Sequence, residues 1–265
     1  MKKTLAMVLA MGMTIASLTA CGGSKPAETT AAATEAETTA AESAAEASSA
    51  EETKAAADIE TVTPGKLTVA TSPDFAPYEF YAIGEDGTPK LAGFDMDLAQ
   101  YIADYLGLEL EVVTVDFDGV ISELQTKSVD LGMAGLSPDE KRMGIMDFSD
   151  LYYMGGQSLV TVKDNAEKYN SFEAINKPDV SVGAQVGSIQ MDLANENSPE
   201  ADIVGLPKVT DIISELLTGK MDAAYIETDV AKSYQKNYPE LTLVMDVPYD
   251  AEGSAIGVCK GNEAL

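Results

Sequence analysis

The amino-acid sequence predicts an α/β fold of two lobes, and two observations support this prediction. Short apolar stretches alternate with stretches of helical apolar spacing, an order typical of open, largely parallel sheets flanked by helices. A helix–turn–strand pattern also recurs, because Glu123-Leu124-Gln125-Thr126 precedes Val129-Asp130 as Glu215-Leu216-Leu217-Thr218 precedes Met221-Asp222. The offset is 92 residues throughout, so the second half repeats the design of the first.

The first 20 residues have the layout of an export signal. A basic start at Lys2 and Lys3 leads into a largely apolar stretch that is too short to span a bilayer comfortably. Cys21 comes directly after small residues, and Leu18-Thr19-Ala20-Cys21 resembles the lipobox of bacterial lipoproteins. The resemblance implies cleavage before Cys21 and a lipid on its sulfur. The simpler alternative is a plain secretory signal with a chance cysteine.

Residues 21–63 are expected to form a disordered, acidic linker. Ala, Thr, Glu and Ser dominate this segment, and large apolar side chains are almost absent. Such a segment buries too little surface to offset the entropy lost on ordering. We therefore expect a spacer that holds the folded part away from the membrane.

The first folded half is expected to alternate strands with two helices. The predicted strands are 67–70, 78–81, 110–115 and 129–136. A helix over 95–106 carries Asp95 and Asp97 in its first turn, where acids suit the helix dipole, and ends at Gly107. These two acids do not face each other, so they indicate a structural role and not an acid/base pair. The second helix is expected to have Asp118 as its cap.

The second half is expected to repeat this order. The predicted strands are 180–184, 203–206 and 223–226, and the predicted helices are 188–195 and one capped by Thr210. The 92-residue offset makes Gly135 and Glu227 equivalent, each at the C-terminal end of a strand. Open α/β sheets bind ligands beyond such ends, so two facing lobes would bring both residues to one cleft. The alternative is a chance match between short patterns that are common in α/β proteins.

The composition excludes several classes of function. A net charge of −27 disfavours binding to nucleic acids and to anionic lipid surfaces. The chain has no histidine, which removes the commonest general base, the commonest zinc ligand and every Ser–His or Cys–His pair. If Cys21 is lipidated, Cys259 has no disulfide partner. No cofactor, no metal site and no nucleic-acid partner are expected.

A series of motifs runs through the folded part. The strongest is Gly93-Phe94-Asp95-Met96-Asp97-Leu98. The others lie at 76–80, 117–121, 129–131, 135–142, 147–149, 183–188, 221–223 and 257–262. In this order the series resembles the bacterial extracellular solute-binding proteins of family 3, which deliver polar amino acids to ABC transporters. The resemblance implies a periplasmic-binding-protein-like fold of type II, with two α/β lobes joined by a two-strand hinge.

The same resemblance implies the limits of the lobes. Lobe 1 is expected to comprise 64–151 and 250–265, and lobe 2 to comprise 157–246, with crossings at 152–156 and 248–250. Relatives continue through a C-terminal helix packed on the first lobe, whereas this chain ends at Leu265 just after a pattern typical of a helix start. We therefore expect the sequence to be truncated.

Arg142 and Glu227 are the candidate charged contacts to a ligand. A planar guanidinium can grip a carboxylate with two parallel hydrogen bonds. The resemblance places Arg142 on the α-carboxylate of an amino acid, and a surface ion pair with Asp139 or Glu140 is the alternative. It places Glu227, where relatives usually carry aspartate, on the α-ammonium group. Here the alternative is an exposed acid at a helix start.

Eight further residues are implied as ligand contacts. Those that would add hydrogen bonds at the carboxylate are Gly135, Ser137 and Ser188. Those that would sandwich the ligand side chain are Phe75 and Phe117, for which ordinary core packing is the alternative. Those that would face the end of the ligand side chain are Ser72, Asp74 and Gln185.

We expect a lipid-anchored, extracytoplasmic and monomeric protein that captures an amino acid by lobe closure. Its partners would be the permease subunits of an ABC importer and, through Cys21, the membrane. No catalysis is expected. One alternative is a dehydratase or lyase of the same fold, similar to cyclohexadienyl dehydratase, which would need a cleft acid or base such as Glu227 or Asp74. The other alternative is a ligand-sensing receptor module.

Overall fold

The computed structural model describes residues 59–250 and 253–265. The predicted export signal, Cys21 and most of the predicted linker lie outside the described residues. Among the helices of the described ranges, none combines the length and the apolar character needed to cross a membrane.

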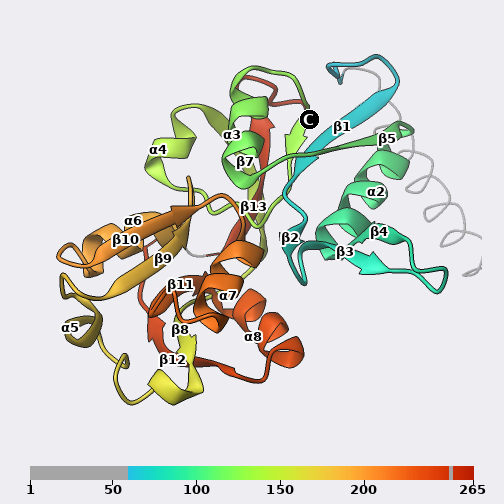
Figure 1. Ribbon diagram of the computed structural model, residues 1–265. Coiled ribbons are helices and arrows are strands. Elements are labelled where there is room, and N and C mark those ends of the chain that lie inside the picture. The colour runs from blue at the N-terminus through green and yellow to red at the C-terminus, as the bar shows by residue number, and fades with distance from the viewer. Residues whose placement is uncertain (1–58, 251–252) are drawn as a thin grey trace, which may run out of the picture. The chain divides into compact units, whose positions relative to one another are not determined.

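The first lobe is built on a five-stranded sheet in the order β5-β1-β6-β13-β7 (Figure 1). Its strands are β1 (Lys66–Thr71), β5 (Glu109–Thr114), β6 (Leu131–Gly132), β7 (Met146–Tyr153) and β13 (Ser254–Cys259). Its helices are α2 (Phe94–Leu106), α3 (Phe117–Gln125) and α4 (Glu140–Met143). A small antiparallel sheet completes the lobe, with strands β2 (Asp74–Phe75), β3 (Glu79–Ile83) and β4 (Pro89–Ala92).

The second lobe is built on a five-stranded sheet in the order β10-β9-β11-β8-β12. Its strands are β8 (Gln157–Val162), β9 (Ser181–Gln185), β10 (Asp202–Leu206), β11 (Ala223–Glu227) and β12 (Leu241–Val247). Its helices are α5 (Phe172–Ile175), α6 (Ile189–Asn197), α7 (Val209–Leu217) and α8 (Thr228–Asn237), with a short 3₁₀ turn, η1 (Lys163–Asn165).

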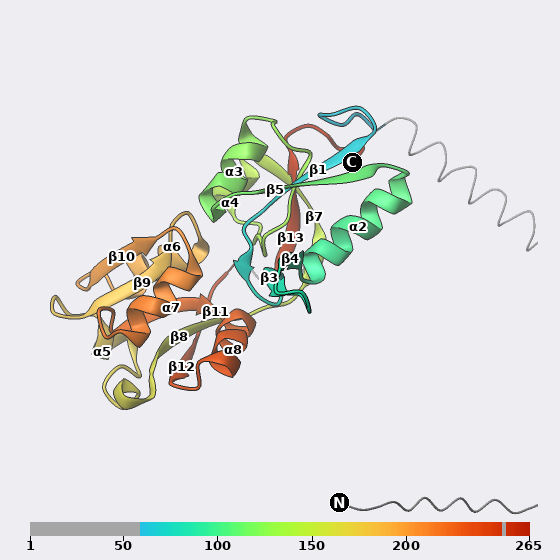
Figure 2. The ribbon, with the colours of Figure 1, turned by 45° about the vertical axis from the view of Figure 1, so that its right-hand side comes forward.

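The chain passes between the two sheets twice, once from β7 to β8 and once from β12 to β13 (Figure 2). The predicted α/β class with two joined lobes is confirmed. The expectation of largely parallel sheets is wrong for half of the strand pairings in the two five-stranded sheets. Strands β13, β7, β8 and β12 pair antiparallel, because the strands next to each crossing enter the sheets in the opposite direction.

The repeated pattern corresponds to repeated structure. Helix α3 begins and ends 92 residues before α7, and β11 begins 92 residues after β6. The predicted caps are wrong, however, because the caps are Asp116 and Lys208 and the helices begin earlier than expected. The first helical residues, Phe117 and Val209, are buried apolar anchors, so Asp118 and Thr210 lie inside the first turn.

The predicted strand over 129–136 is shorter in the structure, where β6 covers only two residues. Gly135 has a φ of +58°, and this left-handed backbone is incompatible with a continuing strand. A Cβ atom at this position would also lie 2.9 Å from the Phe75 ring. The chain leaves the sheet after Gly132, and Gly135 then lines the cavity between the lobes.

Two aromatic residues of the first lobe pack into the apolar core of the second. Phe75 and Tyr78 share one buried cluster with residues of β8, α7 and α8, among them Val160 and Val209. Phe75 lies 5.3 Å and Phe94 4.6 Å from Tyr78 between ring centres. Burial of such large rings contributes strongly to stability, so this cluster stabilises the contact between the lobes.

Candidate ligand-binding site

One cavity lies between the two lobes and is lined by residues of both. Seven of the ten predicted ligand contacts line it: Phe75, Phe117, Gly135, Ser137, Arg142, Gln185 and Glu227. Its free volume is about 10 Å³, roughly the room that one water molecule needs. The surrounding groups thus fill most of the cavity, and a larger molecule enters only if the lobes or side chains move.

Arg142 is the only arginine of the chain, and its guanidinium is buried. It is positioned by α4, whose cap Asp139 accepts a hydrogen bond from the Arg142 backbone N–H and pairs with Arg142 Nε at 3.1 Å. Nη1 donates to the Ser137 carbonyl at 2.9 Å, and Nη2 donates to the Gly187 carbonyl of the second lobe at 3.1 Å. The ion pair with Asp139 that the alternative interpretation expects is therefore present. Arg142 is buried, however, and so the pair is not one of the protein surface.

The environment of Arg142 is costly for a cation. Burial lowers the pKa of its guanidinium, and nearby Asp139 and Asp192 partly offset this. The Phe117 ring centre lies 5.5 Å from its Cζ, an arrangement that favours a cation over the ring face. Two of its three hydrogen-bond partners named above are neutral carbonyls, so an incoming carboxylate would be a stronger partner.

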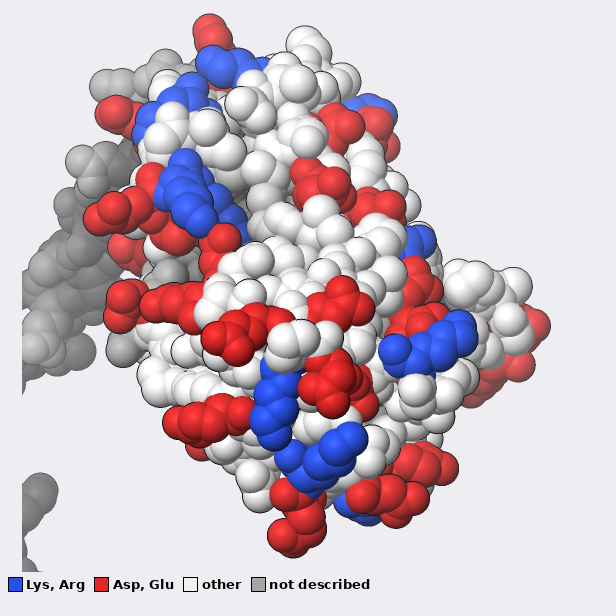
Figure 3. Space-filling view, turned by 60° about the vertical axis from the view of Figure 1, so that its left-hand side comes forward, with Lys and Arg blue, Asp and Glu red and all other residues white. Residues whose placement is uncertain are grey.

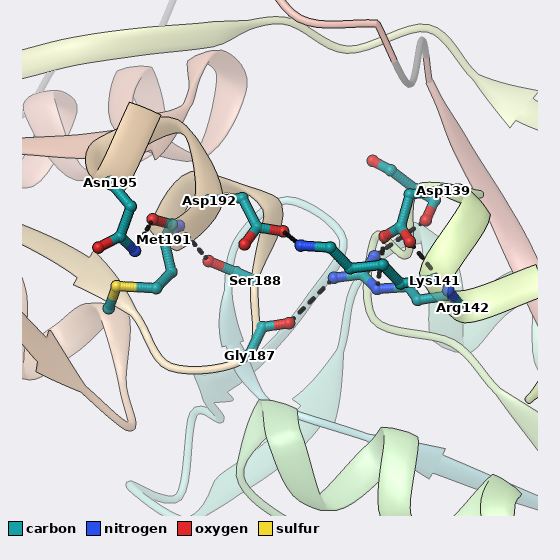
Figure 4. Close-up of polar contacts among 9 residues, drawn as sticks. Asp139, Lys141, Arg142, Gly187, Ser188, Met191, Asp192 and Asn195 are labelled. Carbon is teal, nitrogen blue, oxygen red and sulfur yellow. Dashed lines mark hydrogen bonds and ion pairs between the residues drawn. The ribbon is translucent and has the colours of Figure 1, made fainter. Parts of the chain in front are cut away.

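Arg142 and its neighbour Lys141 reach from the first lobe to the second (Figure 4). Lys141 Nζ lies 2.8 Å from Asp192 on α6, and Arg142 reaches the loop just before that helix. The Lys141 pair is exposed, and such pairs contribute little to stability. Acidic side chains are spread over the face drawn in Figure 3, with basic side chains beside some of them.

Glu227 ends β11 and caps α8, and it is buried. Its Oε2 accepts a hydrogen bond from Val230 N at 2.7 Å, whereas Oε1 has only a long contact of 3.4 Å from Gly156 N. Burial raises the pKa of its carboxyl, and the hydrogen bond from Val230 lowers it. The alternative interpretation, an exposed acid at a helix start, is therefore wrong: Glu227 is buried, and one of its oxygens is weakly satisfied and able to accept a further donor.

Gln185 and Ser188 lie on the second lobe. Gln185 lines the cavity, but its Nε2 already donates to the Pro207 carbonyl at 3.0 Å. Ser188 caps α6, where its hydroxyl accepts from Met191 N and donates to the Gln185 carbonyl at 2.7 Å. Ser188 is not among the residues that line the cavity, so its predicted ligand contact stays a prediction.

Ser72 and Asp74 line a second cavity with a free volume of about 540 Å³. Asp74 accepts hydrogen bonds from the Ser72 hydroxyl at 3.1 Å and from Val209 N at the start of α7. Tyr234 on α8 also donates to the Asp74 carbonyl at 2.7 Å. Asp74 thus joins the two lobes in this structure, a role that the sequence did not indicate.

Several residues of the first cavity were missed as ligand contacts. They are Tyr78, Gly155, Gln157, Ile189, Gln190, Tyr249, Gly253 and Ser254. Gln190 Nε2 donates to Gln157 Oε1 at 2.7 Å, and both side chains are buried. A signal existed for Gly155 and Tyr249, because both fall at the predicted crossings between the lobes. Gln157 and Gln190 lie at a strand start and a helix start, and no pattern marked them.

A buried acid pair lies behind the cavity wall. Asp95 Oδ2 accepts from Gly135 N at 3.3 Å and from the Tyr152 hydroxyl at 3.0 Å. Burial raises the pKa of Asp95 to about 6. Burial, together with the charges of Asp95 and Asp74, raises the pKa of the fully buried Glu79 well above its ordinary value. Burial therefore favours the protonated form of Glu79, which lies close to the Asp95 carboxyl group that accepts from Gly135 N.

Known proteins resemble this chain in sequence and in fold. Residues 67–264 match the family of bacterial extracellular solute-binding proteins, family 3. The chain belongs to this family. The arginine-binding extracellular protein ArtP of Bacillus subtilis is 35% identical over 202 residues, which cover 75% of this chain and 76% of ArtP.

Solved structures of similar proteins agree with this family membership. An amino-acid ABC transporter substrate-binding protein of Streptococcus pneumoniae, bound to L-arginine, has a TM-score of 0.71 and 35% identity over 75% of this chain and 82% of that chain. Holo ArgBP of T. maritima has a TM-score of 0.67 and 33% identity over 74% of this chain and 83% of that chain. These type II structures confirm the fold predicted for this family 3 member.

The comparisons also bear on the enzymatic alternative. Cyclohexadienyl dehydratase of Pseudomonas aeruginosa is 29% identical over 180 residues, covering 68% of this chain and 66% of the enzyme. ArtP is more similar than this enzyme. The expectation of a solute-binding protein of family 3, and not of an enzyme, is therefore confirmed.

Proposed function

We propose that this chain captures an amino acid outside the cytoplasm and delivers it to an ABC importer. One observation supports this most strongly: a buried guanidinium from one lobe and a buried carboxylate from the other line the same cavity. Burying either charge unpaired is costly, and a zwitterionic amino acid would pair with both at once.

In this proposal Arg142 binds the α-carboxylate and Glu227 binds the α-ammonium group. The carboxylate would take over the guanidinium donors that now bond to the carbonyls of Ser137 and Gly187. The ammonium would bond to Glu227 Oε1, whose present contact is long. Neither lobe satisfies both ends of the ligand, so binding favours the closed arrangement of the lobes.

We further propose a cationic side chain on the ligand, with L-arginine as the first candidate. ArtP and the two solved relatives described above are named for arginine or hold it. In this chain the aromatic rings of Phe75 and Phe117 line the first cavity, where they could contact a flat cation, and Asp74 offers a carboxylate in the second cavity. The strongly negative net charge also favours the approach of a cation.

Two further parts of the proposal concern the membrane anchor and the limits of the two lobes. Cys21 would carry a lipid, and the acidic linker would hold the two lobes away from the membrane at a distance that allows contact with permease subunits. Lobe 1 would comprise 64–151 and 250–265, and lobe 2 would comprise 157–246. Mass spectrometry of the protein from bacterial membranes tests the first point, since a chain starting at an unmodified residue would contradict lipidation.

The function is tested by calorimetric titration of the purified protein with each of the twenty amino acids. We expect saturable binding of L-arginine, weaker binding of L-lysine and little binding of acidic amino acids. Binding of none of the twenty would contradict the proposal. Binding of an uncharged amino acid in preference to arginine would contradict only the cationic side chain.

A further inference from the structure

Tyr78 brings a hydroxyl group into the cavity beside Glu227. Its side chain is fully buried, and among the described residues its hydroxyl has no hydrogen-bond partner of good geometry, although Ser254 lies near. Most buried side-chain polar atoms in proteins have a partner, so an orphan of this kind calls for a reason. Tyr78 and Glu227 line the same cavity, which gives the hydroxyl a place where a partner could bind.

The position of this hydroxyl is fixed by its ring. The Tyr78 ring packs against Phe75 and Phe94, and against Tyr153 at 5.6 Å in an edge-on arrangement. Such packing leaves the ring little freedom to turn its hydroxyl elsewhere. The hydroxyl is therefore a fixed feature of the cavity wall.

Gly155 shows how close this hydroxyl is to the carboxylate. A Cβ atom at Gly155 would lie 2.7 Å from Glu227 Oε1 and 3.1 Å from the Tyr78 hydroxyl oxygen. Both oxygens thus approach the same point of the first crossing, which only a residue without a side chain leaves open. They come from different lobes, Tyr78 from the first and Glu227 from the second.

Glu227 Oε1 and the Tyr78 hydroxyl oxygen together suit an ammonium group. Burial and the negative charge of Glu227 raise the pKa of Tyr78, so its hydroxyl stays protonated and neutral. A phenol oxygen can accept a hydrogen bond without adding a second negative charge. An ammonium group has three donors, and one carboxylate oxygen cannot satisfy them all.

We propose that the Tyr78 hydroxyl accepts a hydrogen bond from the α-ammonium group of the ligand, next to Glu227. This assignment rests on the proposed function and adds a residue to it. Tyr78 would then contribute to recognition of the amino group, and it would do so from the lobe opposite to Glu227. Closure of the lobes would bring the two acceptors together.

The test compares the full-length protein with its Tyr78→Phe variant, using two ligands. The ligands are L-arginine and 5-guanidinopentanoic acid, which lacks only the α-amino group. We expect the variant to bind L-arginine about tenfold more weakly, whereas its affinity for the second ligand stays that of the wild type. Tyr101→Phe, at an exposed position on α2, is the matched control and should bind both ligands normally.

The stability of the variant separates this role from a structural one. Removal of an unpartnered buried hydroxyl should leave the midpoint of thermal unfolding unchanged or raise it. Normal affinity of Tyr78→Phe for L-arginine would overturn the assignment, and so would an equal loss for both ligands. If the wild type binds no amino acid, the proposed function fails and the assignment with it.

Discussion

The two lobes place different chemistry on the same structural frame. Helices α3 and α7 occupy equivalent positions 92 residues apart, and Gly135 and Glu227 follow at the same offset. In the first lobe this position is a glycine whose backbone N–H bonds to buried Asp95. In the second it is a carboxylate that caps the next helix. The comparison shows that the repeated structure brings two equivalent positions to one cavity. The single residue at each position then decides whether that position carries a charge.

The lobes also differ in how they position the charged residue that lines the cavity. In the first lobe α4 begins after a turn and brings Arg142 back to the cavity, whereas in the second α8 begins directly after Glu227. The first lobe therefore contributes a positive charge and the second a negative one. The following predictions test whether this division of charge accounts for binding.

The largest effect is expected for Arg142→Ala. The variant removes the one cation among the described residues that line the cavity, so binding of L-arginine should weaken by more than about 100-fold in a calorimetric titration. Lys66→Ala removes a cation of the same lobe that does not line the cavity and lies in an exposed pair, and the variant should bind normally. Retained affinity in Arg142→Ala would show that the first lobe does not provide the carboxylate contact.

Glu227→Gln should have the next largest effect. Glutamine keeps an oxygen that can accept from Val230 N, so the cap of α8 survives while the negative charge is lost. Affinity for L-arginine should fall by about 10- to 100-fold. Glu111→Gln, in an exposed pair of the first lobe, serves as control. An unchanged dissociation constant for Glu227→Gln would remove the proposed role of the second lobe.

The acid pair behind Gly135 predicts a pH dependence of stability that has the same direction as the one expected from the raised pKa of Glu227. Glu79 and Asp95 both have raised pKa values in the folded state, so the folded protein binds protons more tightly than the unfolded chain. Their contribution to stability is complete below pH 4 and is lost as the pH rises through the folded pKa values, beginning with the value of about 6 for Asp95.

Glu79→Gln should reduce this dependence, because a neutral amide cannot lose a proton. We expect the unfolding free energy of the wild type to fall as the pH rises from 5 to 8, and that of the variant to fall less. Urea unfolding at several pH values measures this, with Glu111→Gln as control. Parallel curves for wild type and Glu79→Gln would show that the pair does not titrate in this range.

Asp74→Asn should have the smallest effect of the four. The side chain keeps an acceptor for Val209 N, but its charge at the start of α7 is lost. Binding of L-arginine should weaken by about three- to fivefold, and more than binding of L-glutamine if Asp74 faces the ligand's cationic end. Asp97→Asn, exposed on α2, is the control. Equal losses for both ligands would assign Asp74 to lobe contact alone.

Much of the frame could be predicted from the sequence, because it depends on local patterns. The apolar spacing and Gly107 defined α2 to within one residue. The repeat predicted strand ends at Gly135 and Glu227, which is correct for Glu227 in β11 but wrong for Gly135, because β6 already ends at Gly132. Helix starts were placed wrongly at Asp118 and Thr210, because burial of Phe117 and Val209 outweighs the capping preference. That burial depends on tertiary packing, which a local pattern does not contain.

The candidate site could be predicted at its rare basic residue but not at its acidic residues, which are common throughout the chain. A lone arginine after a strand end indicated Arg142, whereas nothing in the sequence separated Asp74, which joins the lobes, from an acid at the cavity. The sequence did not mark Tyr78 as a ligand contact either, since the role proposed for it depends on its closeness to Glu227, which lies 149 residues further along the chain. Contacts between lobes arise from the whole fold.

The central claim is that opposite charges from the two lobes hold the two ends of one amino acid. A crystal structure of the protein grown with L-arginine tests it most directly. We predict the ligand in the cavity between the lobes, with its carboxylate on the Arg142 guanidinium and its ammonium group on Glu227. An arginine bound elsewhere, or one whose backbone groups contact neither residue, would contradict the account.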